Sequence, residues 1–218
     1  MKKLIIITSF MFLYAGLHAQ DAYTQQMQSA VTKLDAAKTT NDYEQLAINF
    51  MQIASSQKTQ WLPDYYAAFC NAKIGWLKQN TDPDNIEAFA NKSLEQIATA
   101  KSLLDTSKQK KELSEVYCIF SMANRAMVFI NPMSNGRKYG PAAAKYITLA
   151  EQENPDNPRA LYLDAWQKIT TPKLWGGDKT EGKQLLNEAK QKLESNPSTG
   201  VEPHWGKTEI DDMLKKLK

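Results

Sequence analysis

The residues with the most suggestive spacing for chemistry form one glycine-rich segment, Gly177-Asp178-Lys179-Thr180-Glu181-Gly182-Lys183. The segment has the G-x-x-x-x-G-K order of a loop that binds phosphate through its backbone N–H groups. Such a loop also needs a Ser or Thr directly after the lysine to hold Mg²⁺, and a strand in front to aim it. Gln184 follows the lysine, and the Pro-broken stretch 172–175 is too short for that strand. We therefore interpret the segment as a glycine turn whose Asp178 caps a helix.

Two groups of neighbouring carboxylates have the residue types of an acid–base pair. Glu151 and Glu153 form one group, and Asp211 and Asp212 form the other. Paired-acid catalysis needs two carboxylates that face one cleft, whereas neighbouring side chains on a helix point apart. We therefore expect both groups on solvated helix faces, and the sequence indicates no catalytic residue.

Sulfur and imidazole side chains are too few for a metal site. The sequence has two cysteines, Cys70 and Cys118, and one histidine beyond the first 19 residues, His204. A zinc site needs three or four converging ligands, and a Cys–His nucleophile pair is equally hard to assemble from this set. We predict no metal site, no cofactor and no enzymatic activity. The two cysteines could form a disulfide or stay as buried thiols, and the sequence leaves both states open.

Aromatic residues are the most distinctive feature of the chain. One group crowds a single segment and another marks the C-terminal third: Trp61, Tyr65, Tyr66, Phe69 and Trp76, then Tyr162, Trp166, Trp175 and Trp205. Aromatics spaced three and four residues apart commonly fill the interfaces between helices. The functional alternative is that some of them line a groove and hold a partner by stacking and apolar burial.

Helical periodicity dominates after residue 22, and no stretch alternates apolar and polar residues for long enough to predict a strand. Glycines and prolines fall between the periodic segments, which supports the same division. Short connections imply that successive helices run antiparallel. The pattern predicts an all-α fold of about nine helices, at about 22–38, 42–56, 62–79, 83–104, 109–130, 141–153, 157–170, 178–195 and 206–217.

Several of these helices carry a repeated pattern of small and large residues. The clearest copies are Ala143-x3-Ile147-x2-Ala150, followed by Pro155, and Gly182-x3-Leu186-x2-Ala189, with looser copies from Leu46 and from Ala90. Small residues let two helices approach closely, and the large residue fills the remaining space. The pattern resembles the second helix of a tetratricopeptide repeat. The runs 154–160 and 175–179 also resemble exported bacterial tetratricopeptide-like proteins of unassigned activity.

This resemblance implies a right-handed array of antiparallel helix pairs with a protein- or peptide-binding role. The segments 105–108 and 131–140 do not keep a 34-residue period, so an irregular superhelix is expected. If the helices at 62–79, 109–130 and 157–170 are first helices of pairs, their small interface residues align as Ala72, Ala123 and Ala165. The resemblance then assigns six residues to the concave groove: Lys73, Asn124, Trp166, Phe69, Phe120 and Tyr162.

The leading functional prediction is a non-catalytic module that binds a protein or peptide in this groove. A glycan or small-ligand binder that uses surface aromatics is the alternative, and an envelope hydrolase is a third possibility. The register of residues 41–130, the partner's identity and the oligomeric state are not determined by the sequence.

The N-terminus predicts export. Lys2 and Lys3 precede an apolar run that ends at Ala19, as in a cleaved signal peptide, which leaves 20–218 as a single repeat domain. No cysteine follows Ala19 to carry a lipid, so we expect a periplasmic or secreted protein that is not a lipoprotein. Loss of both lysines lowers the formal net charge from +3 to +1. This near-neutral charge argues against nucleic-acid binding, and no second long apolar run indicates a membrane span.

Overall fold

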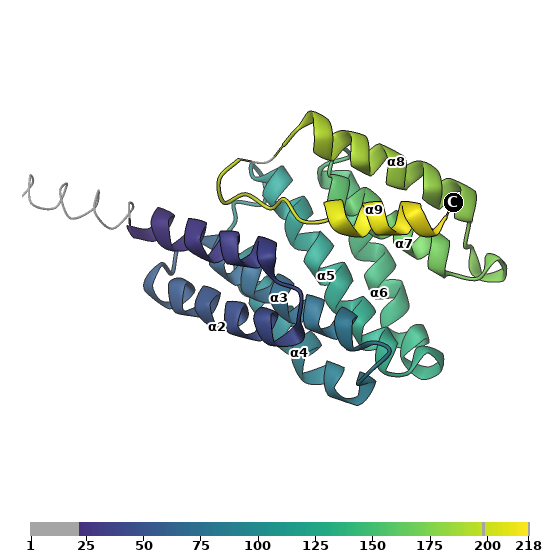
Figure 1. Ribbon diagram of the computed structural model, residues 1–218, viewed down its shortest axis with the longest axis horizontal. Coiled ribbons are helices and arrows are strands. Elements are labelled where there is room, and N and C mark those ends of the chain that lie inside the picture. The colour runs from purple at the N-terminus through teal and green to yellow at the C-terminus, as the bar shows by residue number, and fades with distance from the viewer. Residues whose placement is uncertain (1–21, 198, 218) are drawn as a thin grey trace, which may run out of the picture.

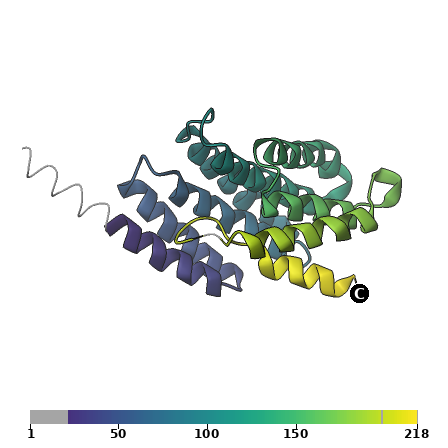
Figure 2. The same ribbon diagram turned by 90° about the horizontal axis from the view of Figure 1, so that it is seen from above.

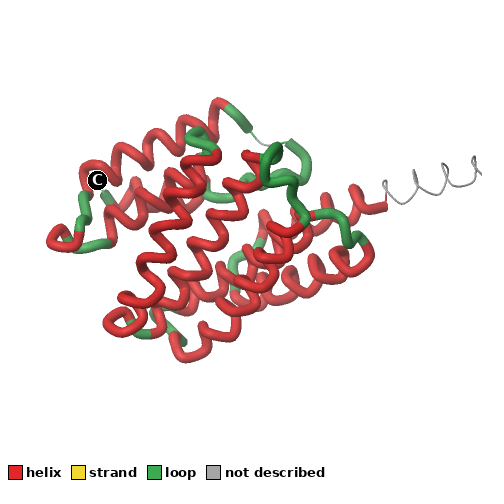
Figure 3. The backbone as a smooth tube through the Cα atoms, turned by 180° about the vertical axis from the view of Figure 1, so that it is seen from behind, coloured by secondary structure: helices red, strands yellow, loops and turns green. Residues whose placement is uncertain are grey.

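The computed structural model describes residues 22–197 and 199–217, and all regular structure in these ranges is helical. The predicted signal segment 1–19 lies outside the described residues. The chain forms a curved stack of helices joined by short loops (Figures 1 and 3). The first helix covers 22–36. It is followed by α2 (Thr40–Ser56), α3 (Trp61–Lys78), α4 (Ile86–Ser102), α5 (Lys110–Ile130), α6 (Pro132–Glu153), α7 (Pro158–Thr170), α8 (Lys179–Ser195) and α9 (Lys207–Lys216). Single 3-10 turns, Pro83–Asn85 and Lys173–Trp175, precede α4 and α8.

The all-α prediction is confirmed, and most helix boundaries agree to within a few residues. The exception is α6, which begins at Pro132 rather than near Pro141. Asn131 caps the helix because its side chain accepts hydrogen bonds from the backbone N–H groups of Met133 and Ser134. Pro132 fits the first turn, where no N–H is needed. Pro141 lies inside α6 on an exposed face, where water can satisfy the carbonyl that the missing N–H leaves free.

Neighbouring helices pack in two different ways. Helices that follow each other along the chain are in contact, and the odd-numbered helices α3, α5 and α7 also pack against one another. The even-numbered helices show no comparable contact among themselves. Helices α3, α5 and α7 are therefore packed more closely than the even-numbered helices. We call the side of the stack that they form the inner face. The tetratricopeptide assignment itself stays a prediction.

Helix α5 is the central element of the stack. It is long and apolar enough to cross a membrane by composition, yet most of it is buried inside the protein. It packs against α3, α4, α6 and α7. These neighbours account for its apolar character, which is that of a core helix.

The glycine-rich segment 177–183 has the predicted structure: a glycine turn, the cap Asp178 and the first turn of α8. Asp178 accepts hydrogen bonds from the backbone N–H groups of Thr180 and Glu181. A Cβ added to Gly177 would lie 1.8 Å from the carbonyl oxygen of Thr171, so only glycine fits there. A Cβ on Gly182 would lie 2.6 Å from Ile169, which confirms a close approach of α7 and α8.

The repeated small residues give a test of the packing. Ala150 and Ala189 are both 0% exposed, whereas Lys183 is exposed on α8. Replacing either alanine by leucine should therefore lower the free energy of unfolding by about 1–3 kcal/mol through overpacking. Urea unfolding of Ala150→Leu, Ala189→Leu and the surface control Lys183→Leu measures this. Equal, small effects in all three variants would contradict the assigned contacts.

Candidate functional site

The C-terminal segment covers much of the inner face. It consists of a strap, residues 199–206, and α9; it leaves α8, loops toward the first helices and returns beside α8 (Figures 1 and 2). The indole of Trp205 stacks on Phe69 of α3, with ring centroids 5.0 Å apart and planes at 27°. The same indole meets Tyr162 of α7 edge-on at 6.3 Å. Trp205 thus lies between two of the residues predicted to line a partner-binding groove.

A buried polar network continues from this indole into the core. Trp205 Nε1 donates to the Tyr65 hydroxyl at 2.8 Å, and that hydroxyl donates to Glu115 Oε2 at 3.1 Å. Arg159 donates from Nε to Glu115 at 2.8 Å and from Nη2 to Oε1 at 2.7 Å. Burial and the nearby Glu115 charge raise the pKa of Tyr65 well above its usual value, so its hydroxyl keeps its proton as a donor.

Further contacts hold the strap and α9 along their length. The Tyr66 hydroxyl donates to the carbonyl oxygen of Val201 at 2.8 Å. His204 Nε2 lies 2.8 Å from the carboxylate of Asp35, and Lys73 of α3 pairs with Glu209 of α9. Three residues predicted for the groove, Lys73, Phe69 and Tyr162, are therefore engaged by the chain's own C-terminal segment.

Three further rings form what we call the aromatic cluster: Trp76 of α3, Phe129 of α5 and Trp166 of α7. The Trp76 and Trp166 centroids are 4.9 Å apart, and Phe129 lies 5.6 Å from Trp76 and 5.8 Å from Trp166. Trp76 Nε1 donates to the carbonyl oxygen of Met122 at 3.0 Å, which fixes its ring. All three rings are partly exposed. Trp166 lies one turn beyond Tyr162, so the cluster continues the face that Trp205 covers.

Arg125 of α5 lies at the edge of this cluster. Its guanidinium carbon is 5.3 Å from the Trp166 ring centroid, within the range of a cation–π contact. Its Nη2 donates to Gln167 Oε1 at 2.6 Å. Partial burial lowers the pKa of Arg125, although it stays charged at ordinary pH.

On α5 the face turned toward Trp166 is shifted by one residue from the predicted register. Asn124 is buried, and its side-chain amide donates to the carbonyl oxygen of Phe120 at 2.8 Å. The Phe120 ring stacks on Tyr146 of α6 at 4.7 Å, away from α7. Arg125 takes the place expected for Asn124. The sequence does not fix this face because α5 is apolar on most sides.

The neighbouring carboxylates have different surroundings. Glu153 pairs with Lys110 at 2.8 Å and Asp211 with Lys190 at 2.6 Å, on partly exposed faces as expected. Glu151 has a similar intermediate exposure but no salt-bridge partner among the described residues. Burial, then the charge of Asp164, raises its pKa to about 7.

Both cysteines are free and buried, so the structure shows the thiol state of the two that the sequence left open. Burial raises the pKa of Cys70 and of Cys118, which makes both poor nucleophiles. Within the part of the chain that the structure describes, no group of three or more His, Cys, Asp or Glu side chains is placed to hold a metal ion.

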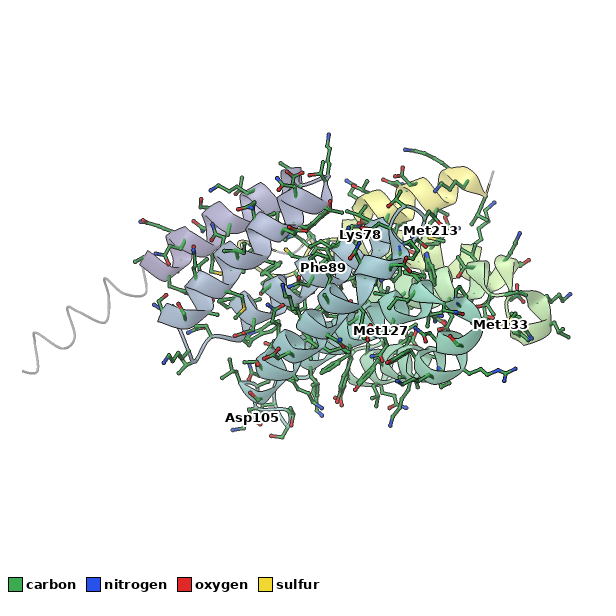
Figure 4. The ribbon with its side chains drawn as sticks, turned by 90° about the horizontal axis from the view of Figure 1, so that it is seen from below. Lys78, Phe89, Asp105, Met127, Met133 and Met213 are labelled. Carbon is green, nitrogen blue, oxygen red and sulfur yellow. The ribbon has the colours of Figure 1, made fainter. Side chains whose placement is uncertain are left out.

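A separate groove lies on the opposite side, between α2 and α4. It has a volume of about 760 Å³ and is lined by Ile48 and Met51 from α2 and by Phe89 from α4, with the carboxylate of Asp64 in its lining. Lys78 lies beside Phe89, with its Nζ 5.9 Å from the ring centroid (Figure 4). The mixture of acidic and apolar groups indicates no particular ligand.

Comparison with known proteins adds one solved structure. The chain is similar to the HusA haemophore from Porphyromonas gingivalis. The two are 27% identical and superpose with a TM-score of 0.78, over 90% of this chain and 92% of the haemophore. The similarity therefore spans the whole helix array rather than one pair. No protein-family model and no curated protein matches the chain.

Proposed function

We propose that this protein is an exported, non-catalytic binding protein whose ligand is a planar, largely apolar molecule of the haem class, bound against the aromatic cluster. The observation that carries the proposal is the cluster itself: the rings of Trp76, Phe129 and Trp166 come together from α3, α5 and α7 and stay partly exposed. The similarity to a haemophore supports the choice of ligand.

The cluster suits a flat ring in physical terms. Aromatic rings stack on other planar systems or meet them edge-on, and both geometries are available from rings set at different angles. Covering about 200 Å² of apolar surface would contribute about 5 kcal/mol before the costs of association.

The proposed recognition is of the macrocycle rather than of its iron. Among the described residues His204 is the one histidine, and both its ring nitrogens have contacts: Nδ1 with the Glu202 carbonyl oxygen at 2.8 Å and Nε2 with Asp35 at 2.8 Å. Cys70 and Cys118 are buried. Neither the imidazole nor the thiols are therefore placed to ligate the iron, and the proposal predicts that an iron-free porphyrin binds about as well as haem, within about tenfold.

Titration of residues 20–218 with haem and with iron-free protoporphyrin tests the proposal, with tryptophan fluorescence quenching as the readout. Both porphyrins should quench saturably. Trp166→Ala should weaken binding by about 1.5–3 kcal/mol, or roughly tenfold to a hundredfold, because it removes a stacking surface. Trp175→Ala is the matched control, since this indole is 76% exposed and lies outside the cluster.

Two results would reject this ligand and site. One is the absence of saturable quenching by either porphyrin. The other is an equal loss of affinity in Trp166→Ala and in the Trp175→Ala control.

A peptide ligand is the second candidate. It is favoured by Trp205, because the inner face already holds an irregular, non-helical segment of this chain through that indole. A peptide partner would have to displace the strap to reach Phe69 and Tyr162. In that case deletion of the strap would increase peptide binding. Porphyrin binding at the aromatic cluster would not require displacement of the strap.

The proposal of export rests on the signal-like residues 1–19 and on the haemophore similarity. A single domain over 20–218 is likewise part of the proposal. A glycan ligand would use the same exposed rings, and a parallel titration with sugars would detect it as saturable quenching of tryptophan fluorescence.

A further inference from the structure

The cations on α3 and α7 share one property, which is that each pairs with a carboxylate. The pairs are Lys73–Glu209, Lys78–Asp82, Arg159–Glu115 and Lys168–Glu181. On α5, Arg125 differs: it is half-buried, and no carboxylate of the described residues lies within salt-bridge distance of it. Its hydrogen bond to the neutral Gln167 amide does not offset its charge.

The guanidinium of Arg125 also has donors to spare. An arginine has five N–H groups, and the structure shows one side-chain hydrogen bond from Arg125. Buried polar side-chain atoms without a partner occur, among the described residues, at Tyr23 and Arg159 and not at Arg125. The remaining Arg125 donors are therefore open to solvent or to a ligand.

The guanidinium of Arg125 lies next to the aromatic cluster, so one ligand can contact both. Arg125 is one turn from Phe129 on α5 and lies against Trp166. A flat molecule stacked on the cluster would therefore place its rim at the guanidinium.

We propose that Arg125 binds a carboxylate on the rim of the ligand, so that the site selects planar apolar molecules with an acidic edge, as in porphyrins that carry propionate groups. This inference rests on the proposed function and specifies the ligand of the same site. A carboxylate and a guanidinium form two parallel charge-assisted hydrogen bonds, an arrangement in which arginine is better than lysine. The ligand would supply the counter-charge that the protein lacks.

The test compares protoporphyrin with its dimethyl ester, which has the same ring and no acidic group. The intact mature chain should bind the diacid at least tenfold more tightly than the ester. Arg125→Gln should remove this preference by weakening diacid binding about tenfold while leaving ester binding unchanged. Arg125→Lys should retain part of the preference, and Arg137→Gln, an exposed arginine on α6, should retain all of it.

The outcomes separate this inference from the proposed function. Equal affinity of the unaltered protein for diacid and ester would overturn the role of Arg125 while leaving the cluster as a porphyrin site. An equal loss for both ligands in Arg125→Gln would also overturn it, because that pattern indicates a structural defect. Failure of both ligands to bind the unaltered protein would reject the proposed function and this inference with it. The comparison on the unaltered chain holds even if a variant does not fold.

Discussion

Replacing Glu115 by alanine is expected to lower the free energy of unfolding by about 3–5 kcal/mol, the cost typical of leaving one partner of a buried ion pair without its counter-charge. The side chains of Glu115 and Arg159 are 8% and 9% exposed, so little water reaches either. The carboxylate accepts from Nε and Nη2 of Arg159 and from the Tyr65 hydroxyl, whereas Arg159 Nη1 already lacks a partner. Removing the carboxylate would leave three further donors unsatisfied.

Urea unfolding measures this loss of stability. Two further variants test whether the loss comes from the uncompensated buried charge. Asp156→Ala removes the exposed partner of Lys192 and should change stability by less than about 1 kcal/mol. The double variant Glu115→Leu with Arg159→Met should recover much of the loss, because apolar side chains of similar volume replace a buried pair at little cost. If Glu115→Ala were no more destabilising than Asp156→Ala, the pair would not be buried as described.

Local sequence patterns predicted the helices well because their signals are local. Asp178 was predicted as a cap and is one, and Ala72, Ala123 and Ala165 are all 0% exposed, as small interface residues should be. The sequence places the start of α6 too late, because Pro141 predicts the first turn of a helix. A proline on an exposed helix face can be accommodated there, so its position alone does not fix a boundary.

The binding face was harder to predict because its residues depend on non-local packing. Helix α5 has neighbours on several sides, so no single apolar stripe separates Asn124 from Arg125. The strap has no periodicity, and Trp205 meets Tyr65, 140 residues earlier in the chain. Nothing in the local sequence indicates that the chain's own C-terminal segment contacts the residues predicted to line the groove. The unpaired charge of Arg125 is likewise visible only once every nearby carboxylate has been placed.

Replacing Trp205 by alanine is expected to cost about 3 kcal/mol, the lower end of the range for removing a large aromatic side chain, since this indole is only partly buried. The change removes the stack on Phe69 and the edge contact with Tyr162, and it leaves the Tyr65 hydroxyl without its donor. The strap would lose its central anchor and should exchange its backbone amide hydrogens faster.

Trp205→Phe separates the two contributions of the indole. It keeps an aromatic ring on Phe69 but loses the Nε1 donor, so it should cost about 1 kcal/mol. Trp175→Ala, at an indole that is 76% exposed, should change stability by less than about 0.5 kcal/mol. Hydrogen exchange over 199–217 together with urea unfolding provides the measurement. Unchanged exchange in Trp205→Ala would show that Tyr66, Asp35 and Lys73 suffice to hold the segment, and that the inner face is closed independently of this indole.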